Sequence, residues 1–174
     1  MPRMPMLSTR DQLLPAARPA FDAIAESRGR VGGPFAVMLH APEVAARAAH
    51  LGSYIRFESG LSKPVRELAT LVAAHVWQCG YEWGAHERQA LAAGVPEATI
   101  AIVANDGSVD ALTAEEAVVV RFGRELLTAH RVEDPTFTAA RAAFGDRGVV
   151  ELTSTFGYYA MLACVLNMAE VEPA

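Results

Sequence analysis

The stretch PVRELATLVAAHVWQCGYEWGAHERQALAA, residues 64–93, determines the fold class of this sequence. Alanine, leucine, glutamate and arginine are frequent in it, and all four favour helices. Ser62 supplies a capping hydroxyl just before the stretch, and Pro64 occupies a position that suits the first turn of a helix. Gly94 follows as a C-cap. The pattern therefore predicts helical structure throughout residues 64–93.

Helical patterns continue on both sides of this stretch. Thr113 followed three residues later by Glu116 is typical of a capping box at the start of a helix. No pair of strand-like runs joined by a hairpin turn interrupts the pattern. The remaining predicted helical segments are residues 21–30, 35–57, 96–104, 112–130, 131–145 and 146–171. We therefore predict an all-α fold, a compact bundle of several helices.

The length and composition indicate one domain. A chain of 174 residues is long enough to bury its own core, so residues 1–174 are interpreted as a single domain. Residues 1–20 contain four prolines and are expected to form an extended N-terminal arm. The hydrophobic fraction of 52% exceeds what one small domain readily hides. We therefore expect a homo-oligomer that buries part of this apolar surface between subunits.

Charge and apolar patterning exclude several classes of partner. The net charge is −5 and the arginines are scattered, which argues against nucleic acid. We expect no membrane-spanning segment, since charged residues interrupt the apolar stretches. Residues 1–15 lack the apolar core of a secretory signal, so we expect a cytoplasmic protein. Two cysteines, Cys79 and Cys164, are too few for a disulfide framework, and Cys164 is expected to be buried and inert.

Residues of three reactive types lie close together in QCGYEWGAH, residues 78–86. On one continuous helix, Cys79, Glu82 and His86 would share a single stripe. Gly80 is a position where that helix is expected to break, because glycine weakens a helix interior. A break there would place Cys79 and Glu82 at a helix N-terminus, which lowers the pKa of a thiol. It would also let Glu67 fold over the same site.

Four interpretations of this stripe remain open from the residues alone. The first is a polar seam between packed helices. The second is a metal site, because His75, Cys79, Glu82 and His86 are all ligand types at helical spacing. The third is a thiol redox site, although the position three residues after Cys79 is not a cysteine. The fourth is acid/base catalysis by Glu82 and His86 with help from Glu67.

Residues 61–103 resemble the signature of the carboxymuconolactone decarboxylase and alkylhydroperoxidase D superfamily. The resemblance rests on Arg66-Glu67-Leu68, a twelve-residue gap to Cys79, and then Cys79-x-x-Glu82-x-x-x-His86. Members of this superfamily are helical and assemble as trimers or hexamers. The resemblance therefore implies an all-helical fold and a trimeric or hexameric assembly. In its peroxidase branch a second cysteine occupies the position of Glu82. Because this sequence lacks that cysteine, we do not expect it to catalyse the family's peroxidase reaction.

The decarboxylase branch of the superfamily works without a cofactor or metal, and keeps a histidine that corresponds to His86. The resemblance therefore implies a cofactor-independent decarboxylase, or a related lyase or isomerase, acting on a small carboxylated lactone or oxygenated organic acid. His86 would donate or accept the proton, Glu82 would orient it, and Glu67 would relay protons. Cys79 would lie beside the reacting centre. The alternatives are a one-cysteine peroxidase using Cys79 and a non-catalytic oligomeric binding protein.

Three further residues are predicted to bind the small-molecule substrate. Tyr81 could donate a hydrogen bond to a substrate oxyanion, and Trp83 flanks the same stripe. Arg88 could bind a substrate carboxylate through two parallel hydrogen bonds, as could Arg66. Packing for the aromatic residues and surface ion pairs for the arginines are the competing interpretations. Other segments that could border the pocket are Arg30 with the adjacent glycines, Tyr158 and Tyr159.

Overall fold

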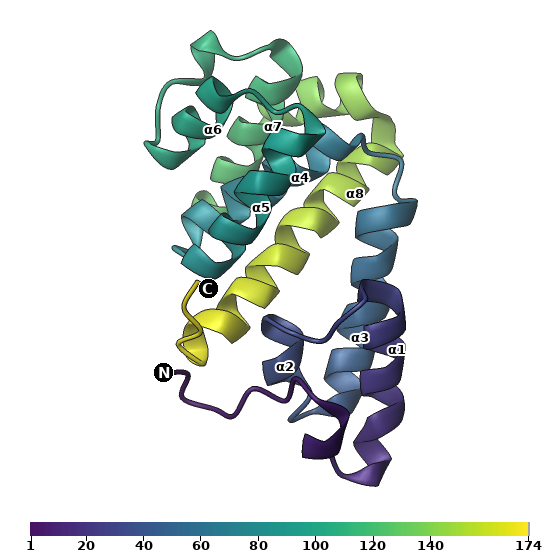
Figure 1. Ribbon diagram of the computed structural model, residues 1–174. Helices are drawn as coiled ribbons and strands as arrows, with labels where there is room; N and C mark the ends of the chain where they lie inside the picture. The colour runs from purple at the N-terminus through teal and green to yellow at the C-terminus, as the bar shows by residue number, and fades with distance from the viewer. Residues whose placement is uncertain (174) are drawn as a thin grey trace.

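The chain is entirely helical in the computed structural model, which describes residues 1–173. Within these residues there are eight α-helices and no strand, so the all-α prediction is confirmed. The α-helices, labelled in Figure 1, are α1 (Arg18–Arg28), α2 (Pro34–Met38), α3 (Pro42–Ser53), α4 (Lys63–Val76), α5 (Gly80–Ala93), α6 (Glu97–Ala104), α7 (Ala114–Arg124) and α8 (Asp134–Met168).

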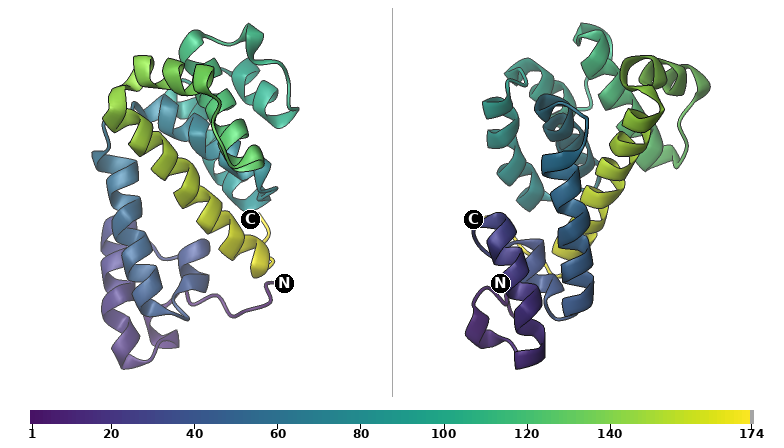
Figure 2. Two further views of the ribbon diagram at one scale, coloured as in Figure 1. Left: turned by 180° about the vertical axis from the view of Figure 1, so that it is seen from behind. Right: turned by 90° about the vertical axis from the view of Figure 1, so that its right-hand side faces the viewer.

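Helix α8 crosses the middle of the molecule and separates two groups of helices (Figures 1 and 2). Helices α1 to α3 lie on one side of it, and α4 to α7 lie on the other. Helix α4 contacts α5, α7 and α8, while α2 is the element of the first group that packs most closely on α8. The two chain ends meet, because the Arg3 backbone N–H donates to the Ala169 carbonyl over 2.8 Å.

The stretch that determines the fold class forms two helices. Ser62 caps α4, since its hydroxyl accepts a hydrogen bond from the Val65 backbone N–H over 3.4 Å. Helix α4 ends at Val76, and α5 begins at Gly80. Between them Gln78 adopts a positive φ of 49°, a conformation that side chains other than glycine rarely take. The reversal at Gln78 turns α5 back against α4 and places their side chains face to face.

Several predicted boundaries differ from those observed. The N-terminal arm is shorter than expected, because α1 begins at Arg18 and two 3₁₀ turns precede it. The capping box at Thr113 and Glu116 is present at the start of α7. The two helical segments predicted at residues 131–145 and 146–171 are both present and are joined end to end in α8. Gly145, with φ of 68° and ψ of 176°, kinks α8 where the sequence suggested a boundary.

Two π-helical turns were not predicted: η3 (Tyr54–Glu58) extends α3, and η5 (Glu125–Ala129) extends α7. A π-turn closes its hydrogen bonds over five residues instead of four, which inserts one residue and changes where the following side chains point. In η3 the Ser59 backbone N–H donates to the Tyr54 carbonyl over 2.9 Å.

The second half of α8 is predominantly apolar. Residues 152–169 carry no charged side chain, so the expectation that charge interrupts every long apolar stretch is wrong. By length and composition α8 could cross a membrane, yet 61% of its most apolar window is buried inside the molecule. Leu152, Phe156 and Leu166 have no exposed surface. This burial is typical of a core helix, which is apolar because neighbouring helices cover it.

Candidate functional site

Three buried polar side chains meet where α4 and α5 face each other. His86 Nδ1 lies 2.7 Å from Glu67 Oε2, and His86 Nε2 lies 3.4 Å from Glu82 Oε2. All three residues are at most 9% exposed. Because a carboxylate only accepts hydrogen bonds, the imidazole donates its Nδ1–H to Glu67. The structure therefore holds one imidazole between two carboxylates in the protein interior.

This arrangement decides the charge of His86. Burial lowers the pKa of His86, since a charged imidazolium loses hydration, but the hydrogen bonds and charges of Glu67 and Glu82 outweigh that effect. The net shift of the His86 pKa is upward from 6.5. The two carboxylates therefore favour the protonated form of the imidazole, which can act as an acid.

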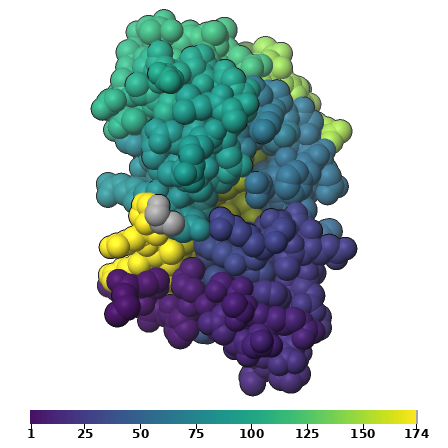
Figure 3. Space-filling view, in the orientation of Figure 1, coloured from purple at the N-terminus to yellow at the C-terminus, as the bar shows by residue number. Residues whose placement is uncertain are grey.

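A cavity of about 260 Å³ opens beside His86 and Glu82. In the space-filling view it corresponds to a hollow between α5 and the segment that precedes α2, with α8 at its floor (Figure 3). The residues that line it are Arg28, Arg30, Gly32, Gly33, Pro34, Phe35, Arg56, Tyr81, Glu82, Ala85, His86, Gln89, Tyr158, Tyr159 and Leu162. Its volume suits a small organic molecule of the size of a metabolite.

Arginines on one wall of the cavity face the acidic groups on the other. Arg28 and Arg30 come from the end of α1 and the loop after it, and Arg56 comes from η3. The sequence suggested Arg30 as a border residue but missed Arg28 and Arg56, whose role depends on how α1 and η3 pack against α5. Three guanidinium groups in one cavity favour an anionic ligand.

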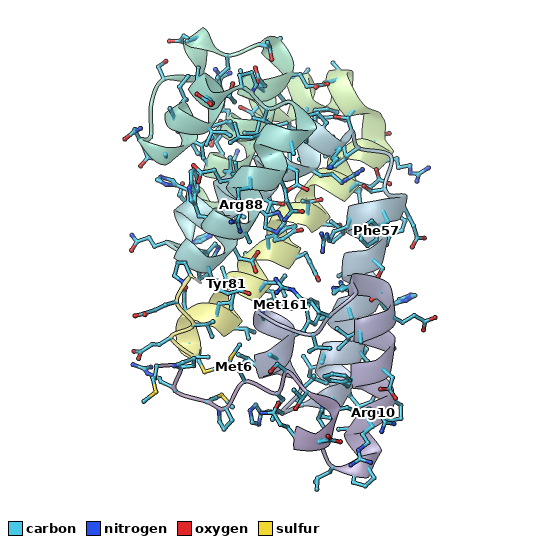
Figure 4. All side chains as sticks on the ribbon, in the orientation of Figure 1. Met6, Arg10, Phe57, Tyr81, Arg88 and Met161 are labelled. Atoms are coloured by element: carbon cyan, nitrogen blue, oxygen red, sulfur yellow. The ribbon has the colours of Figure 1, made fainter. Side chains whose placement is uncertain are left out.

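The two arginines predicted to bind a substrate carboxylate lie elsewhere. Arg66 donates from Nη1 to the Leu61 carbonyl at the start of its own helix. Arg88 is exposed, further along α5 than Tyr81, and does not line the cavity (Figure 4). Helical rotation explains the difference, because Arg88 is two residues past His86 and so points to another side of α5.

Tyrosines complete the wall around the imidazole. Tyr159 meets the His86 ring edge-on, with ring centroids 4.9 Å apart and an interplanar angle of 79°. Tyr158 meets Tyr159 in the same way at 5.3 Å. Tyr81 lines the cavity as predicted for a substrate-binding residue, and its ring lies directly against Gly33. Burial raises the pKa of all three phenols, so each stays protonated and can donate a hydrogen bond.

Trp83 and His75 lie outside the cavity and contact each other, with ring centroids 6.1 Å apart. His75 Nε2 is 3.0 Å from Asp106 Oδ1, which follows the end of α6. The four ligand types of the metal interpretation, His75, Cys79, Glu82 and His86, are therefore not brought together. Across residues 1–173 no group of three or more such side chains could hold a metal ion.

The environments of the two cysteines are opposite to those expected. Cys79 is the N-cap of α5, yet it is 2% exposed and packs with Ala163 and Leu166 instead of lining the cavity. Burial raises the pKa of the Cys79 thiol, more than the backbone hydrogen bonds at the helix N-terminus lower it. The expected lowering of this pKa is therefore wrong. Cys164, expected to be buried, is exposed.

Comparisons with known proteins agree with this geometry. Residues 42–125 match the model of the carboxymuconolactone decarboxylase family. This range contains α3 to α7, and with them Glu67, Glu82 and His86. No protein of curated function matches the sequence.

Three solved structures share the fold. A peroxidase-related protein from Ralstonia eutropha JMP134, described as an alkylhydroperoxidase AhpD core, has a TM-score of 0.79 at 19% identity, over 99% of this chain and 92% of its own. A peroxidase-related protein from Silicibacter sp. TM1040 has a TM-score of 0.74 at 18% identity, over 99% and 94%. A protein of unknown function from Agrobacterium tumefaciens has a TM-score of 0.71 at 18% identity, over 79% and 94%.

The family match covers the helices that hold the buried histidine and its two carboxylates, and the shared fold extends over the rest of the chain. Residues 42–125 therefore match the carboxymuconolactone decarboxylase family, and the whole chain has the fold of the AhpD-like structures.

Proposed function

We propose that the protein is a cofactor-independent acid/base enzyme that decarboxylates a small carboxylated lactone or oxygenated acid, or carries out a related lyase or isomerase step. One observation carries this proposal: His86, held between Glu67 and Glu82, borders a cavity that three arginines also line. An acid and an anion-binding wall within one small cavity are what such a reaction requires.

In the proposed reaction the bond between the substrate carboxylate and its neighbouring carbon breaks, and carbon dioxide leaves. The electron pair of that bond stays on the carbon and spreads into an adjacent carbonyl, which becomes an enolate. A proton from the Glu82–His86 pair then reaches the carbon, and solvent restores it through the same pair. No electron acceptor is needed, because the reaction has no net oxidation.

The cavity wall supports the stages of this reaction that involve negative charge. Arg28, Arg30 and Arg56 bind carboxylate groups of the substrate that are retained in the product. The Tyr81 hydroxyl, which stays protonated, donates a hydrogen bond to the enolate oxygen. Glu67 lies behind the imidazole, fixes its orientation through Nδ1 and favours its charged form.

Two observations weigh against the competing functions. A one-cysteine peroxidase would need a reactive thiolate, whereas Cys79 is buried, lies outside the cavity and has a raised pKa. A binding protein with a degenerate site would have a filled pocket, whereas open space borders His86.

The test is carbon dioxide release, or isomerisation, from a panel of small carboxylated lactones and keto acids. For a substrate that turns over, His86→Gln and Glu82→Gln should each lower kcat by about 100-fold or more, since each removes a proton-transferring group. Cys79→Ser serves as the control and should retain activity. Unchanged turnover in both glutamine variants would rule out the proposal.

We also propose that the enzyme works as a cytoplasmic homo-oligomer, a trimer or a hexamer. Val150, Met161 and Met168 are exposed on α8 at 64%, 37% and 52%, which leaves apolar surface for a second subunit to cover. Sedimentation equilibrium measures the mass in solution, and a monomer at micromolar concentration would contradict this assembly.

A further inference from the structure

The turn η3 carries one of the three arginines of the cavity. Arg56 lies at its centre, lines the cavity, and its Nη2 is 3.5 Å from the Gln89 Oε1 on α5. The residue before it, Ile55, is 1% exposed, and the residue after it, Phe57, points outward and is 61% exposed (Figure 4). The direction of the Arg56 side chain therefore depends on how this π-turn is held in place.

Glu151 on α8 holds both ends of that turn. Its Oε1 accepts a hydrogen bond from the Tyr54 hydroxyl over 2.7 Å, and its Oε2 accepts one from the Gly60 backbone N–H over 2.9 Å. Tyr54 is the first residue of η3, and Gly60 is the second residue after it. One carboxylate thus connects the beginning and the end of the turn to the central helix.

Glu151 is itself well buried, at 6% exposure, and does not line the cavity beside His86. Arg147 donates to it from the solvent side over 2.9 Å. Burial raises the pKa of Glu151, but its hydrogen bonds outweigh that effect and the net shift is downward, so the carboxylate is ionised and accepts all three hydrogen bonds. Glu151 lines a different cavity, together with Gly60 and Arg147. A buried charge outside the cavity beside His86 needs another role, because burying it costs free energy.

We infer that Glu151 is a positioning residue for substrate recognition: by binding both ends of η3 it fixes the turn so that Arg56 presents its guanidinium group to the cavity. The inference rests on the proposed function, in which the cavity binds a carboxylated substrate. It adds a residue that lies outside the cavity and outside the acid/base pair. Its effect should appear in the affinity for a carboxylate and not in proton transfer.

The test is a double-mutant cycle with succinate as the probe, measured by isothermal titration calorimetry on the full-length protein. Arg56→Gln should weaken succinate binding by about 10-fold, as expected for one hydrogen bond to a charged group. Glu151→Gln removes the charge and replaces one accepting oxygen by a donating NH₂ group, which cannot accept from Arg147, so the connection to the turn is weakened. It should weaken binding by about 3- to 10-fold. The double variant should bind no more weakly than Arg56→Gln alone, since Glu151 acts through Arg56.

Two further variants separate positioning from general destabilisation. Glu116→Gln changes a carboxylate with hydroxyl partners that is remote from the cavity, and it should leave succinate binding unchanged. Tyr54→Phe removes only one of the two connections and should give a smaller loss than Glu151→Gln. Tyr54→Phe also provides the test if Glu151→Gln does not fold.

The outcomes distinguish the positioning role of Glu151 from the proposed function of the cavity. Additive losses in the double variant, or unchanged binding in both Glu151→Gln and Tyr54→Phe, would overturn the positioning role and leave the carboxylate-binding cavity intact. No binding of succinate by the wild-type protein would overturn both. A loss confined to Arg56→Gln and its double variant likewise removes Glu151 from substrate recognition.

Discussion

Glu67 and His86 are 19 residues apart in the sequence, yet a 2.7 Å hydrogen bond joins Glu67 Oε2 to His86 Nδ1. The chain reversal at Gln78 makes this possible, because it turns α5 back along α4 and brings the two side chains to the same buried layer. The bond fixes the tautomer of the imidazole and leaves Nε2 directed at Glu82 and the cavity. The proposed acid/base role of the site depends on this contact.

The first prediction concerns the charge of His86. Glu67→Gln removes the carboxylate that favours the imidazolium, so the pKa of His86 should fall while burial continues to lower it. NMR titration of the His86 ring protons in the wild type and the variant measures the change. An unchanged His86 titration would contradict the interpretation.

The second prediction concerns stability and pH. The pKa of His86 is raised in the folded protein, so its protonated form stabilises the fold fully below the ordinary value of 6.5. This contribution is lost as the pH rises through the raised value. The difference in free energy of unfolding between wild type and His86→Gln should therefore shrink from pH 6 to pH 9. Urea unfolding of both proteins at several pH values measures this difference in the free energy of unfolding. A difference that grows with pH would refute the prediction.

The sequence was sufficient to predict the helical class, the cap at Ser62, the capping box at Thr113 and the stretch that contains Glu67, Glu82 and His86. These features are local, because each depends on residue types within a few positions of one another. The expected break near Gly80 lies two residues earlier, at Gln78, which adopts a positive φ although it is not a glycine.

Features that depend on packing were not predictable. Arg28 and Arg56 line the cavity only because α1 and η3 pack beside α5, and nothing in their local sequence indicates it. Cys79 does reach a helix N-terminus, as a local pattern suggested, but the apolar side chains of α8 surround it and raise its pKa. The π-turns likewise have no local signal, since they continue α3 and α7 with ordinary helix-forming residues.

The third prediction tests the contact between Gly33 and Tyr81. A Cβ at Gly33 would lie 2.9 Å from the Tyr81 ring and hydroxyl, and its backbone has φ of 54° and ψ of −135°. Gly33→Ala should therefore destabilise the fold by about 1–3 kcal/mol and also displace Tyr81. Kinetics should show a raised KM in addition to a lower Tm.

Gly29→Ala is the matched control for this experiment. Gly29 also has a positive φ, of 76°, but a Cβ there would meet nothing within 4 Å. It should destabilise the fold by about 1–2 kcal/mol without changing KM. Equal kinetic effects of the two variants would mean that the Tyr81 contact is unimportant.

The fourth prediction concerns the packing of α7 on α8. A Cβ on Gly123 would lie 2.5 Å from the Phe156 ring and 2.7 Å from Val72, so Gly123→Ala should destabilise the fold by about 1–3 kcal/mol. Gly157 on α8 has open space around it, and Gly157→Ala should stabilise the fold by about 0.5–1 kcal/mol. Thermal unfolding measures the Tm of both variants relative to the wild type. Tm shifts of the same sign in the two variants would contradict the packing described.

The fifth prediction concerns the two thiols. Cys164 is exposed, whereas Cys79 is buried with a raised pKa, so an alkylating reagent at pH 7 should modify Cys164 first and Cys79 much more slowly. Mass spectrometry of peptides after timed labelling of the native protein gives both rates. After denaturation the rates should converge. Faster labelling of Cys79 in the native state would restore a thiol-based function as a candidate.

Arg28 and Arg30 have a further consequence because of where they lie in the chain. The family match spans residues 42–125, which includes the histidine and both carboxylates but neither of these two arginines. In the proposed function, the acid/base group and these two ligand-binding arginines are thus encoded in separate portions of the sequence. A lineage that keeps the first and varies the second could acquire new substrates without disturbing the catalytic apparatus, and directed evolution of this scaffold should begin at residues 28–33.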